Sequence, residues 1–256
     1  MSTSSERCGP RAMDAMNQGV TSFVRTMPRK YRQLFDEPVV AMHAAIVERR
    51  GERAAHAEIW RSFSEGGVAV CVVSDDAAGL LARIGAALVA HGLDVVAAQV
   101  YCRVGERGRP EAVDFFWVRR VGPAAPPVQE ADVAALAETL GELVRGDAGL
   151  ERLRRVAPVA RGRSLQMRVG FETDARDGAT VLTVQGTDRP GLLFMISKAL
   201  FAEDVRITHS DVATHDGQVL DRFHLTEMDG SVLRRARLLG IQTAVLAAID
   251  GAEMRA

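Results

Sequence analysis

The sequence predicts an α+β fold of two βαββα modules with antiparallel sheets, preceded by a short helical segment. Two observations lead to this expectation. Residues 66–101 resemble residues 178–213 at a constant offset of 112 (Asp188 against Asp76), which indicates a duplicated unit. Within each copy, alternating apolar residues give way to apolar residues spaced by three and four. We expect a helical segment over 1–64, a first module over 65–172 and a second module over 173–256.

The two copies match around an acidic position and a glycine. The matched pairs are Asp76 and Asp188, Gly79 and Gly191, Leu80 and Leu192, Leu81 and Leu193, Ile84 and Ile196, Val95 and Ile207, and Val100 and Val212. The match resumes with Asp114 on Asp221 and Phe116 on Phe223, where the offset has become 107. Apolar residues in register over two segments this long indicate one fold used twice. A chance tandem of similar coils is the alternative.

Each copy carries the same order of expected elements. Val68, Val70 and Val72, like Leu182 and Val184, alternate as in a strand. One face of a helix of about three turns is then marked by Leu81, Ile84 and Leu88, and by Leu193, Ile196 and Leu200. Two strands follow, joined by the longer VGERGRPEA in the first copy and by a tight hairpin at His215, Asp216 and Gly217 in the second. A last amphipathic helix is marked by Val133, Leu136, Leu140 and Val144, and by Leu238, Ile241, Val245 and Ile249.

One further strand is expected between the copies, at residues 165–171. Its alternation suits either a strand that closes the first sheet or one that precedes the second module. No such segment follows the last helix of the second copy. We therefore expect the two sheets to share or exchange this element, with no separate fourth strand in each module.

The composition is that of an ordinary globular protein. Of the 256 residues 47% are hydrophobic and 25% charged, and no run approaches the about 18 apolar residues of a membrane helix. A net charge of −1 gives no electrostatic reason for a nucleic-acid or membrane partner. The start MSTSSERCGP has no signal-peptide pattern, so we expect a cytoplasmic protein. Because Cys8, Cys71 and Cys102 lack CxxC spacing and the histidines form no i, i+4 pair, we expect no disulfide framework, metal or cofactor.

The chemistry of the repeat is concentrated in Asp188-Arg189-Pro190-Gly191-Leu192-Leu193, between a strand and a helix. Pro190 suits a first helical turn, where its missing N–H has no helical partner. Gly191 removes a Cβ where a ligand or another backbone approaches closely. The N–H groups that follow point outward at the positive end of the helix dipole, which is a site for an α-carboxylate. Two roles are open to Asp188: capping the helix, or meeting the ammonium group of a ligand.

This stretch resembles the signature of ACT domains, the amino-acid-sensing modules of many metabolic enzymes, over roughly residues 66–252. The resemblance implies ferredoxin-like modules that pair side by side, as a homodimer or within one chain. It also implies a small-molecule amino acid as ligand. The candidate contacts are Asp188, Arg189, Gly191, Leu192 and Leu193, with Asp76, Gly79, Leu80 and Leu81 in the first copy. His209 and Asp211 share strand parity on the segment that lines the neighbouring pocket in ACT pairs, and they are further candidates.

The tandem arrangement, with FVRTMPRKY and VVAMHAAIV ahead of it, resembles the C-terminal part of protein-PII uridylyltransferase/uridylyl-removing enzymes. In that family the ACT pair is understood to report glutamine. The resemblance therefore implies a sensor in nitrogen regulation, with glutamine as the first ligand to consider. The chain has no Gly-Ser followed by Asp-x-Asp, the metal-carboxylate arrangement that nucleotidyl transfer requires. We therefore expect no catalytic residue and no enzyme activity.

Other functions remain open. The resemblance to the whole family favours an enzyme of the uridylyltransferase type, and a third possibility is an adaptor that dimerises without a small ligand. A protein partner is open as well. The arginines between the copies form either a solvated linker or a docking site for an acidic partner: Arg152, Arg154, Arg155, Arg161 and Arg163. The first copy reads Asp76-Ala77-Ala78-Gly79, without the arginine and proline of the second, so we expect it to be the weaker ligand site.

Overall fold

A computed structural model describes residues 10–105, 108–122, 124–145, 167–176 and 178–251. The arginine cluster from Arg152 to Arg163, and Cys8, lie outside these ranges. Three helices come first: α1 (Pro10–Thr26), α2 (Arg29–Leu34) and α3 (Glu37–Arg50). The Asp36 carboxylate caps α3 by accepting a hydrogen bond from the Val39 N–H at 3.2 Å, and Gly51, with φ of +57°, ends it.

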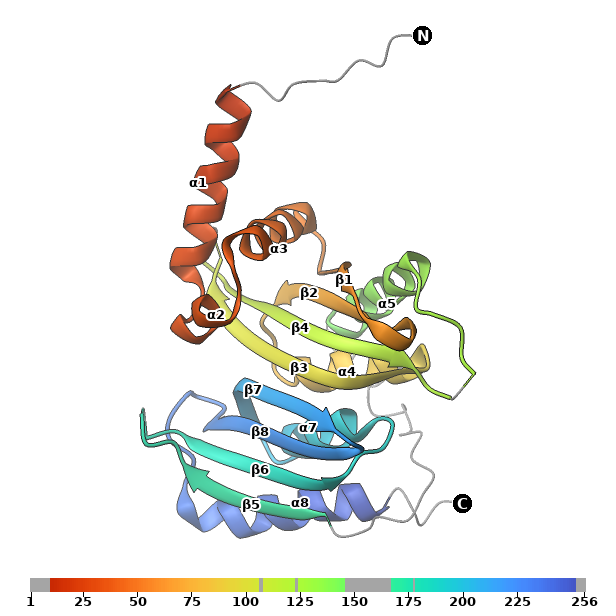
Figure 1. Ribbon diagram of the computed structural model, residues 1–256. Helices are drawn as coiled ribbons and strands as arrows, with labels where there is room; N and C mark the ends of the chain where they lie inside the picture. The colour runs from red at the N-terminus through yellow and green to blue at the C-terminus, as the bar shows by residue number, and fades with distance from the viewer. Residues whose placement is uncertain (1–9, 106–107, 123, 146–166, 177, 252–256) are drawn as a thin grey trace.

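Eight antiparallel strands form one sheet in the order β1-β2-β4-β3-β7-β8-β6-β5. The first half-sheet contains β1 (Ala55–Ser62), β2 (Val68–Asp75), β3 (Leu93–Val104) and β4 (Pro110–Arg120). The second half-sheet contains β5 (Arg168–Thr173), β6 (Thr180–Thr187), β7 (Val205–His215) and β8 (Gln218–Glu227). The halves meet where β3 pairs with β7, from Ala97 opposite Ala213 to Tyr101 opposite His209. The two copies therefore pair side by side within one chain (Figure 1).

Each half-sheet carries two helices in equivalent places, which confirms the α+β prediction and the repeat. The helices α4 (Leu80–Ala90) and α7 (Leu192–Ala202) follow the second strand of each half, and α5 (Glu130–Leu143) and α8 (Leu238–Gly251) follow the last. Short 3-10 turns occur at η1 (Ser64–Gly66) and η2 (Arg235–Arg237). The predicted tight hairpin joins β7 to β8, with φ of +50° at Asp216 and +70° at Gly217. No helix that the structure describes is long and apolar enough to cross a membrane.

The prediction of a shared strand is wrong. β1 pairs with β2 and β5 pairs with β6, so each half-sheet has its own additional edge strand. The segment of β1 lies within residues 1–64, which were expected to be helical. Ala55, Ala57 and Ile59 alternate with polar residues, but this pattern is short and ends at a bulge at Trp60. Both faces of β1 are covered: Ala55 and Ala57 join one apolar cluster, and Trp60 joins the other. The expected boundary at 64/65 separates β1 from the half-sheet that it joins, and the expected boundary at 172/173 falls within β5.

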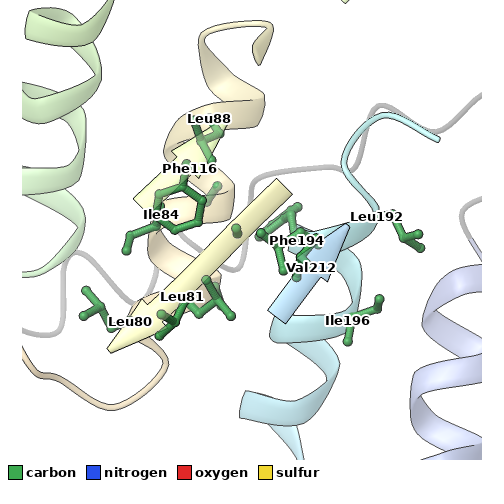
Figure 2. Close-up of a cluster of buried hydrophobic side chains, with 14 of the residues drawn as sticks. Leu80, Leu81, Ile84, Leu88, Phe116, Leu192, Phe194, Ile196 and Val212 are labelled. Carbon is green, nitrogen blue, oxygen red and sulfur yellow. The ribbon is translucent and has the colours of Figure 1, made fainter. Parts of the chain in front are cut away.

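One apolar core runs continuously under both half-sheets, on the face that α4, α5, α7 and α8 cover. Figure 2 shows its centre, with Ile84 of α4 beside Phe116 of β4, and with Phe194 on the neighbouring helix α7. A Cβ built on Gly85 would lie 3.0 Å from the Phe194 Cα, so this glycine allows the two helices to pack closely. The two halves therefore share helix packing as well as strand pairing.

A second apolar cluster covers the opposite face of the first half-sheet only. It is built around the aromatic residues Phe23, Tyr31, Trp60, Tyr101 and Phe115, beneath α1, α2 and α3. Tyr31 and Phe115 are fully buried, with ring centroids 5.7 Å apart. The N-terminal helices thus form a cap on one half of the sheet.

Candidate functional site

The repeated loops lie at the same place in each half, between the second strand and its helix. Gly79 has φ of +68° and Gly191 has φ of +78°, the left-handed conformation that favours glycine. Each glycine is the N-cap of its helix, and neither helix has a side-chain cap. Asp188 instead accepts a hydrogen bond from the Thr214 hydroxyl at 3.1 Å. The Asp188 side chain therefore does not cap α7.

Each of the two repeated loops lines a pocket, and the pockets are numbered after the copies. The second pocket lies at the loop of the second copy. The loop contributes Asp188, Arg189, Gly191, Leu192 and Leu193 to its walls. The first half-sheet contributes Leu93, Asp94 and Val95 from the start of β3, and β7 and β8 contribute Val212, Thr214, Val219 and Asp221. The cavity measures about 20 Å³. This pocket is therefore built by both halves and has almost no free space.

Asp94 enters the second pocket from the other half-sheet. Its side chain is buried, and its carboxylate accepts a hydrogen bond from the Gly191 N–H, the group that the sequence assigned to a ligand carboxylate. Burial, together with repulsion from Asp188, raises the pKa of Asp94 to about 6, and Arg119 opposes this shift. The anion position at the start of α7 is thus occupied by the protein itself.

The first pocket lies at the equivalent loop of the first copy. Asp76, Ala77, Ala78, Gly79, Leu80 and Leu81 form one side, and Val100, Cys102, Ala112 and Asp114 form the floor. Arg206, Ile207 and Met228 come from the second half-sheet. The cavity measures about 120 Å³. A Cβ built on Gly79 would lie 2.7 Å from the Phe201 ring of α7, so this loop also packs closely on the other half.

The two pockets are related by the repeat, but their charges differ. Arg206 is the counterpart of Asp94 at the same offset of 112 residues (206 minus 94). Each of these side chains reaches the loop of the opposite half. The Arg206 guanidinium forms an ion pair with the Asp76 carboxylate, which also accepts a hydrogen bond from the Cys102 thiol. The first pocket therefore receives a cation where the second receives an anion.

Two buried aspartates line the floors of the pockets, Asp114 in the first and Asp221 in the second, each 1% exposed. Asp114 Oδ1 accepts a hydrogen bond from the Tyr101 N–H at 3.1 Å, and Asp114 Oδ2 has no partner among the described residues. The Asp221 carboxylate interacts with the Ala213 N–H, which opposes the effect of burial on its pKa. Burial raises the pKa of Asp114 well above its usual range and that of Asp221 to about 7. The repeat aligned these two residues, but sequence reasoning assigned them no role. Their signal was an acidic residue repeated in an apolar strand.

Arg189 holds its loop in place. Its Nη2 donates to the Ile249 carbonyl oxygen near the end of α8. The first copy has Ala77 in place of this arginine and therefore lacks the anchor. The leucines after each glycine are buried in the shared core: Leu80, Leu81, Leu192 and Leu193.

His209 and Asp211 line neither pocket. They lie on the opposite face of β7, where the His209 Nδ1–H donates to the Val100 carbonyl oxygen at 2.7 Å and Lys30 of α2 forms an ion pair with Asp211. Although burial alone would raise it, hydrogen bonds from His209 and Lys30 lower the pKa of Asp211 to about 2. His209 and Asp211 share a face of β7, but a β-bulge between Ile207 and His209 places that face opposite the one that Ile207 presents to the first pocket. These two residues attach the N-terminal cap to the second half-sheet.

The fold and its pockets define a class: paired ββαββα modules with pockets shared across the seam between them. No family model matches the chain. The chain is 32% identical to the bifunctional uridylyltransferase/uridylyl-removing enzyme of Rhodospirillum rubrum over 186 residues, which cover 70% of the chain and 19% of that enzyme. The enzymes of the same name from Phenylobacterium zucineum and Caulobacter vibrioides are 28% and 27% identical, over 89% and 91% of the chain and 24% and 25% of their own lengths.

The chain is therefore homologous to one region of these bifunctional enzymes, and it spans about a fifth to a quarter of their length. Among solved structures, a trimeric bacterial microcompartment shell protein, PduB, aligns over 80% of this chain and 89% of its own with 10% identity and a TM-score of 0.24. That score is too low to support an inference about the fold. Among the described residues, no group of histidine, cysteine and acidic side chains is arranged to hold a metal ion.

Proposed function

We propose that this chain is a non-catalytic regulatory region of the ACT type, which binds an amino acid and acts in nitrogen regulation, in the cytoplasm. The observation that carries the proposal is the composition of the pockets. Each one combines a left-handed glycine loop from one half-sheet with a charged side chain from the other, Asp94 or Arg206. A molecule bound there contacts both halves, so its binding free energy depends on how the halves are packed.

The homology supports the same proposal. The relatives are named for uridylyl transfer and removal, and the matched region is a minor part of each. A region that reports a metabolite to an enzyme needs a ligand pocket and a packing that responds to it. We take L-glutamine as the first ligand to test, because the resemblance to the regulatory region of these enzymes points to it.

A melting experiment tests this function directly. Glycine and the L-enantiomers of the other nineteen standard amino acids are each added at 5 mM. The D-enantiomer of each chiral amino acid serves as a control for solvent effects, and glycine is compared with buffer alone. A single-site ligand at about 100 times its Kd adds about 2.7 kcal/mol to the free energy of unfolding. For a chain of this size that corresponds to a rise in Tm of about 5 to 10 °C. If no L-amino acid raises the Tm above its D-enantiomer, the proposed function is wrong.

Uridylyl transfer is the second candidate, because the relatives carry that activity in their names. Labelled UTP and purified PII protein are incubated with the chain, with and without Mg²⁺. We expect no label on PII. Labelled PII would replace the proposed function with an enzymatic one. If neither label nor a Tm shift is found, the remaining function is an adaptor that binds no small ligand.

A further inference from the structure

The two pockets differ in their free space. A cavity needs about 10–15 Å³ to hold one water molecule. The second pocket, at about 20 Å³, therefore has room for one water. The first pocket, at about 120 Å³, has about six times that space. The cavity lined by Gly191 of the intact motif is thus smaller than the cavity lined by Gly79 of the degenerate motif. Asp188, Arg189 and Pro190 also line a separate hollow of about 620 Å³, together with Asp94 and Arg119.

The Asp94 carboxylate explains why the second pocket is small. It accepts from the Gly191 N–H, at the positive end of the α7 dipole where an external carboxylate would bind. Asp188 lines the same pocket. An amino acid that placed its α-carboxylate there would have to displace one carboxylate and lie beside another. The protein side chain therefore acts as a built-in occupant of this position.

The first pocket offers the opposite arrangement. A guanidinium can hold a carboxylate through two parallel hydrogen bonds, and Arg206 is 39% exposed, so it can turn from Asp76 toward a ligand. Asp76, released from Arg206, can accept from an ammonium group. Asp114 adds an independent indication of a ligand: its Oδ2 has no partner, although the residue is 1% exposed and lines the cavity. A buried polar oxygen of this kind gains a hydrogen bond when a ligand supplies one.

We infer that the first pocket is the ligand site of this chain and takes a small zwitterion, with Arg206 on its carboxylate, Asp76 on its ammonium group and Asp114 on a polar group of its side chain, while Asp94 keeps the second pocket closed. This inference rests on the proposed function and deepens it. It reverses the ranking expected from the motif, in which the first copy was the weaker site.

Calorimetric titration of the full chain tests the assignment, with L-glutamine and every other standard L-amino acid that raises the Tm as titrants. We expect one site per chain. Arg206→Met, which keeps the aliphatic stem and removes the charge, and Asp114→Asn should each weaken binding by tenfold or more. The matched change in the second pocket, Asp221→Asn, should leave the Kd within twofold. Circular dichroism checks that each variant is folded.

The same titration tests the role of Asp94. Asp94→Ala removes the carboxylate from the Gly191 N–H and should raise the number of binding sites per chain from one to two. Asp94→Ser repeats the test with a side chain that leaves less empty space than alanine does. Two sites in the unaltered chain, or loss of binding in Asp221→Asn with full binding in Arg206→Met, would overturn the inference. A single site in both Asp94 variants would overturn the role of Asp94. If no amino acid binds any of these proteins, the proposed function itself has failed.

Discussion

The two half-sheets share one fold, but they differ on the face that points away from α4, α5, α7 and α8. In the first half, that face carries Cys71, Phe115 and Trp117, and the helices α1 to α3 cover it. The equivalent positions in the second half, found by the offsets of 112 and 107, are Thr183, Arg222 and His224. All of the buried members of the second apolar cluster lie between residues 23 and 115.

This difference shows what the duplicated fold requires and what it leaves free. The face toward the shared core is apolar in both copies, because a half-sheet cannot be stable without burying it. The other face is apolar only where helices cover it. In the second half it carries polar side chains that form their own ion pairs, such as Arg222 with Glu172 at 2.6 Å. The N-terminal helices thus pack on the first half-sheet because its face toward them is apolar.

Exchanging equivalent residues of the two faces should have the largest effect on the free energy of unfolding. Phe115→Arg places a charge in the fully buried cluster beneath Tyr31 and should lower the free energy of unfolding by about 5 kcal/mol or more, since losing a buried Phe side chain alone costs about 3–5 kcal/mol. The reciprocal change, Arg222→Phe on the open face, should alter it by less than about 1 kcal/mol. Urea denaturation followed by circular dichroism measures both. Similar losses from the two changes would show that the faces are equivalent.

A smaller effect concerns His43, which α3 holds in the same cluster. Its ring is fully buried, its Nδ1 lies 2.8 Å from the Tyr31 hydroxyl, and burial lowers its pKa from 6.5 to about 3. The folded state therefore holds this ring neutral, whereas the unfolded chain protonates it below pH 6.5. The free energy of unfolding should fall by about 1.4 kcal/mol for each pH unit from 6.5 toward 3 because of His43.

The measurement compares the pH dependence of the unaltered chain with that of the double variant Tyr31→Phe/His43→Leu, which removes both partners together and leaves neither unpaired. The comparison is needed because Asp94 and Asp221, whose pKa values are raised, titrate over the same range with the opposite sign. The double variant lacks the His43 contribution. Its free energy of unfolding, compared with that of the unaltered chain at the same pH, should therefore be more favourable at pH 5 than at pH 7. An unchanged slope would contradict the burial of a neutral ring.

The sequence was sufficient to predict the order of elements, because apolar spacing and a repeated loop are local signals. The edge strand β1 was missed because Ala55, Ala57 and Ile59 alternate only briefly before the bulge at Trp60 interrupts the pattern. The roles of Asp94 and Arg206 could not be predicted either. Which strand reaches which loop depends on the pairing of β3 with β7, and that register joins residues more than 100 positions apart, as Tyr101 and His209 show. The parity of His209 and Asp211 gives no signal of the bulge between Ile207 and His209, which places both residues on the face away from the pockets.

Ligand binding at the seam between the half-sheets is the central expectation for this protein. Hydrogen exchange followed by mass spectrometry, with and without 5 mM L-glutamine and each further L-amino acid that raises the Tm, tests this most directly. We predict slower exchange in two segments that are distant in sequence, the loop and first turn at 76–83 and the start of β7 at 205–208. The outer strands β1 and β5 should show smaller changes. Protection confined to one half-sheet, or unchanged exchange at both segments with an amino acid that raises the Tm, would contradict the account.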